Sequence, residues 1–194
     1  MRLFVLVRHG QSELNATQRV NGDPNVHVAL TLQGEQEATA LAVQLTGVAL
    51  DLCVHTRFGR SRHTAEIALD GRAVHRDVEP LLDDIDLGEL EGRTIDEYRA
   101  WKRDHDRRDP FPGGESLDAA ALRYADAYEH LLARPEPRIL VVCHEIPVRY
   151  AVNAVRGSAE LDGPVHEIRN CVPYLFDAAG LERVAARMRA LASR

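Results

Sequence analysis

Four short, largely apolar runs constrain the fold of this 194-residue chain more than any other feature. They lie at residues 3–7, 50–54, 139–143 and, more weakly, 172–176. Their apolar residues are continuous and do not alternate with polar ones, which predicts strands buried on both faces of a sheet. Stretches of helical periodicity separate the runs. This alternation predicts an α/β fold: a three-layer sandwich with a mostly parallel central sheet flanked by helices.

Start and stop signals place three helices between the runs. The first follows Thr31 and ends before Gly47, because apolar residues between them recur at helical spacing. A second helix is predicted over about residues 59–69, and a third begins at Ser116, a favourable N-cap. We expect residues 1–194 to form one domain, a length that can bury a substantial core.

The segment 92–115 departs from this alternation because it mixes charges of both signs around a single tryptophan. Its basic residues are Lys102, Arg103, Arg107 and Arg108. We interpret the segment as an excursion over one end of the sheet, with a short helix from Thr94; a solvated charged face is the alternative. If the excursion covers a binding pocket, its basic residues would select a second anionic group on a substrate.

Composition argues against several classes of function. The chain has 30 acidic and 24 basic residues, a net charge of −6, whereas a nucleic-acid partner requires a basic surface. Cys53, Cys143 and Cys171 lie in or beside apolar runs and are predicted to be buried thiols in a reducing compartment. The run at 3–7 is too short for a signal peptide or a membrane span. We therefore expect a cytoplasmic protein with no membrane partner, and a homodimer is one assembly that the sequence allows.

Polar side chains follow three of the apolar runs, where the predicted strands end. Arg8 and His9 follow the first run and His144 follows the third, while Arg60 begins the helix after the second. Ligands of open α/β sheets bind beyond the carboxyl ends of the strands. If the first and third strands are neighbours, His9 and His144 face each other across a small pocket. Because guanidinium groups match phosphate oxygens, this grouping predicts an anion site.

The arginines also bear on the chemistry of His9. A neighbouring cation disfavours the imidazolium form, so we expect His9 to be neutral near pH 7, with a ring nitrogen able to attack phosphorus. A leaving alkoxide must be protonated, and the segment 80–92 supplies candidate acids. These are Asp83, Asp84, Asp86, Glu89 and Glu91, among which composition does not choose. The sequence holds no spacing typical of a metal site and no phosphate-binding glycine loop ending in Gly-Lys-Ser/Thr.

The stretch "LVRHGQSELN" at residues 6–15 resembles the signature of the histidine phosphatase superfamily, the phosphoglycerate mutase-like proteins. Similar blocks follow in the family's order: "RVNGDP" at 19–24, "LTLQG" at 30–34, "HTRFGRSRHTAE" at 55–66, "DDIDLGELEG" at 83–92, "GGES" at 113–116 and "VVCHE" at 141–145. The resemblance covers most of the chain.

The resemblance implies a metal-independent phosphomonoesterase that acts on a small phosphorylated metabolite and needs no cofactor. His9 would attack phosphorus and become phosphohistidine, while Arg8, Arg60 and His144 hold the phosphoryl oxygens. Asp84 would protonate the leaving oxygen and then activate the hydrolytic water. Further substrate contacts are implied for Ser12, Asn15, Asn21, Gly22 and Glu145.

Two departures from the family pattern leave alternatives open. Asp84 stands where glutamate is common, and because aspartate is shorter, Asp83 is the competing acid. Glu145 stands where glycine is usual, and its carboxylate would either repel a highly anionic substrate or bind a cationic or hydroxylated group. The alternative functions are a cofactor-dependent phosphoglycerate mutase and a degenerate phosphate-binding regulatory protein. The compact chain favours hydrolysis, because such mutases typically carry a longer insertion that shields the phosphoenzyme from water.

Overall fold

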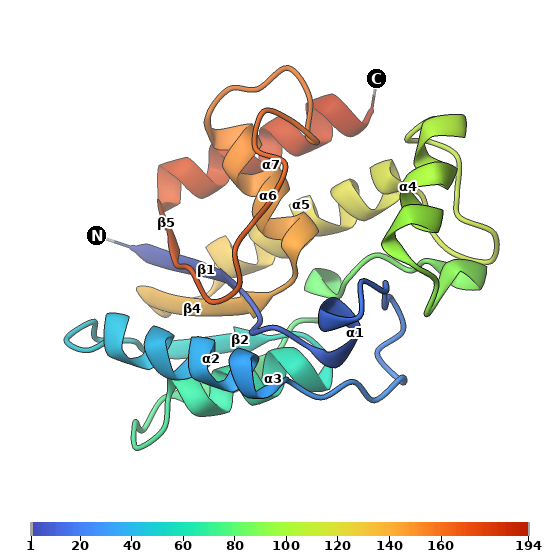
Figure 1. The fold of residues 1–194 in the computed structure, drawn as a ribbon. Helices are drawn as coiled ribbons and strands as arrows, with labels where there is room; N and C mark the ends of the chain where they lie inside the picture. The colour runs from blue at the N-terminus through green and yellow to red at the C-terminus, as the bar shows by residue number, and fades with distance from the viewer. Residues whose placement is uncertain (1, 194) are drawn as a thin grey trace.

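A computed structural model describes residues 2–193 and contains a five-stranded sheet of order β3-β2-β4-β1-β5 (Figure 1). The strands are β1 (Leu3–Arg8), β2 (Leu52–His55), β3 (His75–Val78), β4 (Arg138–Cys143) and β5 (Tyr174–Asp177). The first four run parallel, and β5 is antiparallel to β1. The predicted mostly parallel sheet is confirmed, and β1 and β4, the first and third of the predicted strands, are neighbours.

Helices cover both faces of the sheet and complete the three layers (Figure 1). One face carries α2 (Leu32–Gln44) and α3 (Gly59–Ala68); the other carries α5 (Leu117–Ala133), α6 (Glu145–Val155) and α7 (Ala178–Ala192). Beyond the carboxyl ends of the strands lie α1 (Glu13–Ala16), α4 (Ile95–Asp104) and the 3₁₀ turns η1 (Pro80–Leu82) and η2 (Gly88–Leu90). None of the helices within residues 2–193 is long and apolar enough to cross a membrane.

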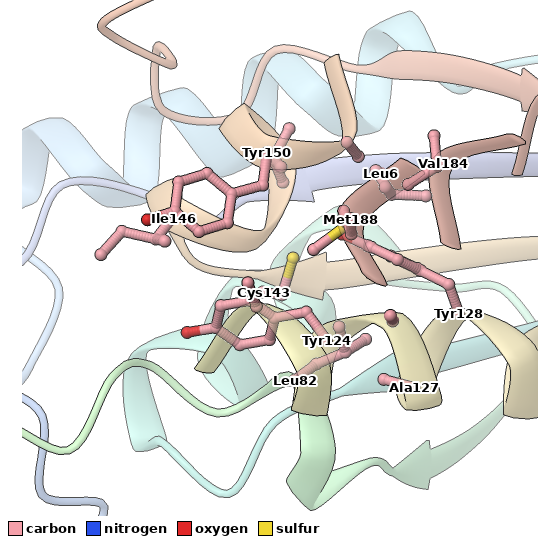
Figure 2. Packing of buried hydrophobic residues seen from close by; sticks show 14 of the residues in the cluster. Leu6, Leu82, Tyr124, Ala127, Tyr128, Cys143, Ile146, Tyr150, Val184 and Met188 are labelled. Carbon is pink, nitrogen blue, oxygen red and sulfur yellow. The ribbon is translucent and has the colours of Figure 1, made fainter. Parts of the chain in front are cut away.

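The alternation of side chains along β1 builds a core on each side of the sheet. Phe4 and Leu6 pack with α5, α6 and α7, where Tyr124, Tyr128 and Met188 fill the centre of the larger core (Figure 2). The intervening residues of β1 contact α2 and α3 instead. Successive side chains of a strand point to opposite faces, so a continuous apolar run serves both cores. The three cysteines are buried free thiols, as expected.

Three of the predicted helices begin at polar caps, whereas α3 begins after Phe58, whose side chain makes no cap hydrogen bond. The hydroxyls of Thr31, Thr94 and Ser116 each accept a backbone N–H from the first turn of the helix that follows. Each cap satisfies a donor that has no partner within its helix. The sequence pattern does not reveal β3, because this edge strand is mostly exposed and lacks an apolar run.

Two glycines bring α2 against the turn that follows β1. A Cβ atom on Gly10 would collide with the carbonyl oxygen of Gly34, and one on Gly34 would collide with that of Gln11. The side chain of Glu37 then accepts the backbone N–H of Gln11 at 2.8 Å. This close backbone approach fixes the turn that carries His9.

Candidate active site

The polar residues at the strand ends converge on one place. Arg8 ends β1 and His9 follows it, Thr56 follows β2, and His144 follows β4 as the N-cap of α6. Because β1 and β4 are paired, the ring centroids of His9 and His144 lie 5.3 Å apart.

Arg60 lies at the centre of this group. Its side chain is only 4% exposed. Its Nε donates to Nε2 of His9 at 2.9 Å, and its guanidinium also donates to the side-chain oxygen of Asn21. The remaining nitrogen lies 3.1 Å from Oδ2 of Asp84 and 3.2 Å from Nδ1 of His144. One guanidinium therefore orients both histidines and the carboxyl group.

The hydrogen bonds of His9 define which ring nitrogen can react. Its Nδ1 lies 2.7 Å from the carbonyl oxygen of Gly10. A carbonyl oxygen only accepts, so we assign the proton to Nδ1, which leaves the lone pair on Nε2. Burial, followed by the charges of Arg60 and Arg8, holds the pKa of His9 well below 6.5. His9 is therefore neutral, with Nε2 as its nucleophilic atom.

His144 has no exposed surface and lies behind Arg60. A guanidinium only donates, so Nδ1 of His144 accepts from Arg60 and its Nε2 donates to the Thr56 hydroxyl at 2.9 Å. Burial, then Arg60, lowers the pKa of His144 well below 6.5. Both ring nitrogens are thus engaged within the protein. The expected contact of His144 with a phosphoryl oxygen stays a prediction, and in this structure the ring supports Arg60.

The two candidate acids occupy different environments. Asp84 contacts Arg60 and lies 3.4 Å from Nδ1 of His144. Burial raises the pKa of Asp84 above its usual value, although Arg60 opposes the shift. The carboxylate of Asp83 instead accepts from the backbone N–H of Arg57 at 2.9 Å and from its Nε at 2.5 Å. Asp84, unlike Asp83, lines the main cavity.

The site opens into a cavity of about 670 Å³. Of the residues predicted from the sequence, its wall includes Arg8, His9, Ser12, Asn15, Asn21, Arg60, Asp84 and Glu145. Gly22 is not brought to this wall, since its N–H donates to Glu91 at 2.6 Å and it borders a second hollow of about 550 Å³. Asn21 bridges the two regions, with its oxygen on Arg60 and its amide nitrogen on Glu91.

The excursion contributes α4 to the cavity wall, but fewer of its cations than expected. Lys102 lines the cavity together with Tyr98 from the same helix. Arg107 is held away from the wall by ion pairs with Asp118 and Asp162. Arg103 and Arg108 are exposed side chains outside the lining. The idea that all four basic residues face the pocket is therefore corrected to Lys102 alone.

The lining residues that were not anticipated include two that contact predicted site residues. Arg149 follows Glu145 by one turn of α6, and its NH1 lies 3.1 Å from Oε1 of Glu145. This i, i+4 spacing of opposite charges on a helix is a sequence signal that could have identified Arg149. Asn170 donates to the backbone carbonyl of His9 at 2.6 Å from a loop far along the chain. No local pattern marks this second residue.

Comparison with known proteins agrees with this geometry. The family model of the histidine phosphatase superfamily (branch 1) matches residues 4–189. A protein of Erwinia tasmaniensis named "Probable phosphoglycerate mutase GpmB" is 30% identical over 174 residues, covering 86% of this chain and 80% of the relative. Its namesake from Photorhabdus laumondii is 32% identical over 179 residues, with the same coverage.

Solved structures show the same fold. The alpha-ribazole phosphatase from Shigella flexneri superposes with a TM-score of 0.79 at 23% identity, covering 90% of each chain. A mycobacterial glucosyl-3-phosphoglycerate phosphatase in complex with VO3 superposes with a TM-score of 0.75 at 24% identity, covering 90% of this chain and 92% of the other.

A neutral buried histidine, flanked by arginines and by a carboxyl group of raised pKa, forms a site for reactions of phosphate esters. The fold and the site together define an enzyme that acts on phosphate esters. The chain belongs to the histidine phosphatase superfamily, branch 1.

Proposed function

We propose that this enzyme is a metal-independent phosphomonoesterase that hydrolyses a small phosphorylated metabolite through a phosphohistidine at His9. The observation that carries the proposal is the contact of Nδ1 of His9 with the carbonyl oxygen of Gly10. The Gly10 carbonyl holds the proton on Nδ1, so the lone pair of His9 is on Nε2, where it accepts from Nε of Arg60. An incoming phosphoryl group would offer its oxygens to this donor, which frees the Nε2 lone pair to attack phosphorus. A neutral imidazole in this state is an activated nucleophile for phosphorus.

The reaction proceeds in two steps. The Nε2 lone pair of His9 forms a bond to phosphorus while the bond from phosphorus to the ester oxygen breaks. The protonated carboxyl group of Asp84 transfers its proton to the departing alkoxide. Water then attacks the phosphohistidine, Asp84 takes a proton from it, and the P–N bond breaks to return neutral His9 and inorganic phosphate.

Arginines supply the charge that the transferring phosphoryl group requires. Arg60 lies against Nε2 of His9, and Nε of Arg8 is buried with no hydrogen-bond partner within the described part of the chain. Asn15 lines the cavity and can donate from its side-chain amide. These donors would stabilise the equatorial oxygens, so the proposal needs no metal ion and no cofactor.

A phosphoglycerate mutase is the second candidate, because relatives at 30% and 32% identity bear that name. Hydrolysis is favoured by the position of Asp84, which borders both the main cavity and the second hollow. Its side chain is 21% exposed. Water therefore has access to the group that would activate it, whereas a mutase must keep water from its phosphoenzyme.

Phosphate release from p-nitrophenyl phosphate in the presence of EDTA tests the proposal. Wild type should release phosphate, and His9→Ala should lose roughly a thousandfold or more of the rate. His75→Ala, which changes an exposed histidine of the edge strand β3, is the matched control and should retain the rate. Activity that survives in His9→Ala, or that EDTA abolishes, would overturn the proposal. Interconversion of 2- and 3-phosphoglycerate with little phosphate release would favour the mutase.

A further inference from the structure

Glu145 lies between two arginines at the wall of the cavity. Its Oε2 is 2.9 Å from NH1 of Arg8, and its Oε1 is 3.1 Å from NH1 of Arg149. The side chain of Arg149 is only 11% exposed. The Glu145 carboxylate therefore occupies the position from which an anionic group of a substrate would contact both guanidinium groups.

Beyond Glu145, the cations at this end of the cavity are also paired with carboxylates. The NH2 of Arg149 lies 3.1 Å from Oδ1 of Asp162, and Nζ of Lys102 lies 3.8 Å from the same oxygen. Arg107 joins Asp162 to Asp118. Apart from Arg8, which lies beside His9, the network contains three cations and three carboxylates: Lys102, Arg107 and Arg149 with Asp118, Glu145 and Asp162. Its formal charge is zero, so a second substrate anion meets no surplus positive charge there.

The other cations of the cavity wall do not change this balance. Arg19 and Arg99 are exposed at the rim, and Arg99 lies 3.6 Å from Asp96. Exposed charges are screened by solvent and salt. Arg8 and Arg60 are the buried or nearly buried cations beside His9, and the phosphoryl group requires them.

The same end of the cavity offers hydrogen-bond donors that have no partner within residues 2–193. The Tyr98 hydroxyl and Nε of Arg149 are both buried and unpaired. Burial raises the pKa of Tyr98 well above its usual value, so this hydroxyl keeps its proton and can donate. Together with the acceptor oxygens of Glu145, these donors suit the hydroxyls of a substrate better than they suit a second charged group of a substrate.

We propose that Glu145 selects phosphate monoesters whose remaining part is uncharged and hydroxylated, and excludes those with a carboxylate close to the phosphate. The inference rests on the proposed function, because it places the phosphoryl group at His9. A substrate carboxylate that approached Arg8 and Arg149 would meet the Glu145 carboxylate already placed between them, and the repulsion between two like charges is strong in a partly buried site.

Glycerol 3-phosphate and 3-phosphoglycerate form a matched pair of probes, because they differ only in a terminal hydroxymethyl group or carboxylate. Wild type should prefer glycerol 3-phosphate in kcat/KM. In Glu145→Gln, the ratio of kcat/KM for 3-phosphoglycerate to that for glycerol 3-phosphate should rise at least tenfold. The same ratio should also rise in Glu145→Ala, so a folding defect in only one of the two variants cannot explain the result. Glu182→Gln removes an exposed charge on α7, remote from the cavity wall, and should keep the wild-type ratio.

Calorimetric binding of the two probes separates this inference from the proposed function. In a His9→Ala background, which prevents turnover, Glu145→Gln should shift the ratio of the two dissociation constants in the same direction. A shifted binding ratio without hydrolysis in wild type would overturn the proposed function and support the role of Glu145. Hydrolysis with the same ratio in wild type, Glu145→Gln and Glu145→Ala would overturn the role of Glu145 and leave the proposed function standing.

Discussion

Burial acts on His9 and Asp84 in opposite directions, and each shift suits one step of the reaction. It lowers the pKa of His9, so the nucleophile has no proton on Nε2. It raises the pKa of Asp84, which favours the protonated form that a general acid requires. Burial favours the uncharged form of each group, and these are the forms that a nucleophile and a general acid need at the start of the reaction.

Asp84→Asn should affect esters according to their leaving group. An alkoxide needs the proton of Asp84, so kcat/KM for glycerol 3-phosphate should fall roughly 100- to 10,000-fold. p-Nitrophenolate leaves without protonation, so p-nitrophenyl phosphate should lose much less in the phosphorylation step. Because the pKa of Asp84 is raised, the wild-type rate with the alkyl ester should fall as pH rises through that value. This fall should be absent in the variant.

Asp83→Asn is the control for this experiment, since the Asp83 carboxylate holds Arg57 outside the cavity. Its effect should not depend on the leaving group. Equal losses for both esters in Asp84→Asn would show that Asp84 is not the general acid.

At the scale of elements, α5 positions the segment that carries Asp84. NH1 of Arg123 donates to the carbonyl oxygens of Leu81 and Asp83 at 2.8 and 3.0 Å. The guanidinium is itself held by Glu115. Arg123 is thus a positioning residue, which acts on the reaction through the backbone before Asp84.

Arg123→Met should lower kcat/KM about 10-fold or more for glycerol 3-phosphate, with a smaller loss for p-nitrophenyl phosphate, because kcat/KM reports the phosphorylation step and only the alkoxide needs a proton in that step. Arg187→Met is a matched control, since Arg187 donates to the Ser158 carbonyl from α7, away from the cavity wall. Steady-state kinetics with both esters checks the prediction. A purely structural role would lower the melting temperature without changing the ratio of the two rates.

The contact between α2 and the turn after β1 gives a prediction for stability. Gly34→Ala places a Cβ atom against the backbone oxygen of Gln11, so the turn and the helix must move apart. Such overpacking typically costs about 1–3 kcal/mol of the free energy of unfolding. Urea unfolding measures this loss. Gly71→Ser is a comparison without a collision, because nothing lies within 4 Å of its Cβ position, although its positive φ adds strain. A Gly34→Ala protein as stable as wild type would contradict the packing described here.

Sequence patterns predict the elements that bury apolar residues and miss those that do not. The runs ending at Arg8 and Cys143 are buried on both faces and are readily detected. The exposed edge strand β3 leaves no apolar pattern. β5 begins at Tyr174, slightly later than the weak run that predicted it.

The candidate site is only partly predictable for a similar reason. His9 and Arg60 follow strands whose carboxyl ends meet, so topology alone brings them together. The place of His144 behind Arg60 depends on side-chain packing against Thr56, which spacing does not encode. Asn170 reaches His9 from a loop about 160 residues away in sequence, so no short-range pattern identifies it.

At the scale of the whole molecule, the two buried histidines make stability dependent on pH. Both have pKa values well below 6.5 in the folded state, whereas the unfolded chain titrates near 6.5. Below about pH 6.5 the unfolded state therefore binds more protons, and stability falls as pH decreases. The raised pKa of Asp84 has the opposite effect on stability, but it involves one proton, whereas the two histidines involve two.

The contribution of the two histidines to the free energy of unfolding should thus be fully present above about pH 6.5. It should decline below that pH, by up to roughly 1.4 kcal/mol per pH unit for each histidine. Urea unfolding from about pH 8 to about pH 5 measures the decline. His105→Gln, which changes an exposed histidine at the end of α4, should leave the slope unchanged. A stability that is constant between about pH 7 and pH 5 would show that the two histidines are not held neutral.

The covalent intermediate is the most direct test of the whole account. Wild type and Asp84→Asn are mixed with p-nitrophenyl phosphate, quenched in base, and digested for mass spectrometry of the peptides. We expect a phosphoryl group on His9 that survives base and is lost in acid. It should accumulate in Asp84→Asn, where the group that activates water is missing. Phosphate release during which His9 is never phosphorylated, or phosphorylation of another residue, would contradict the account.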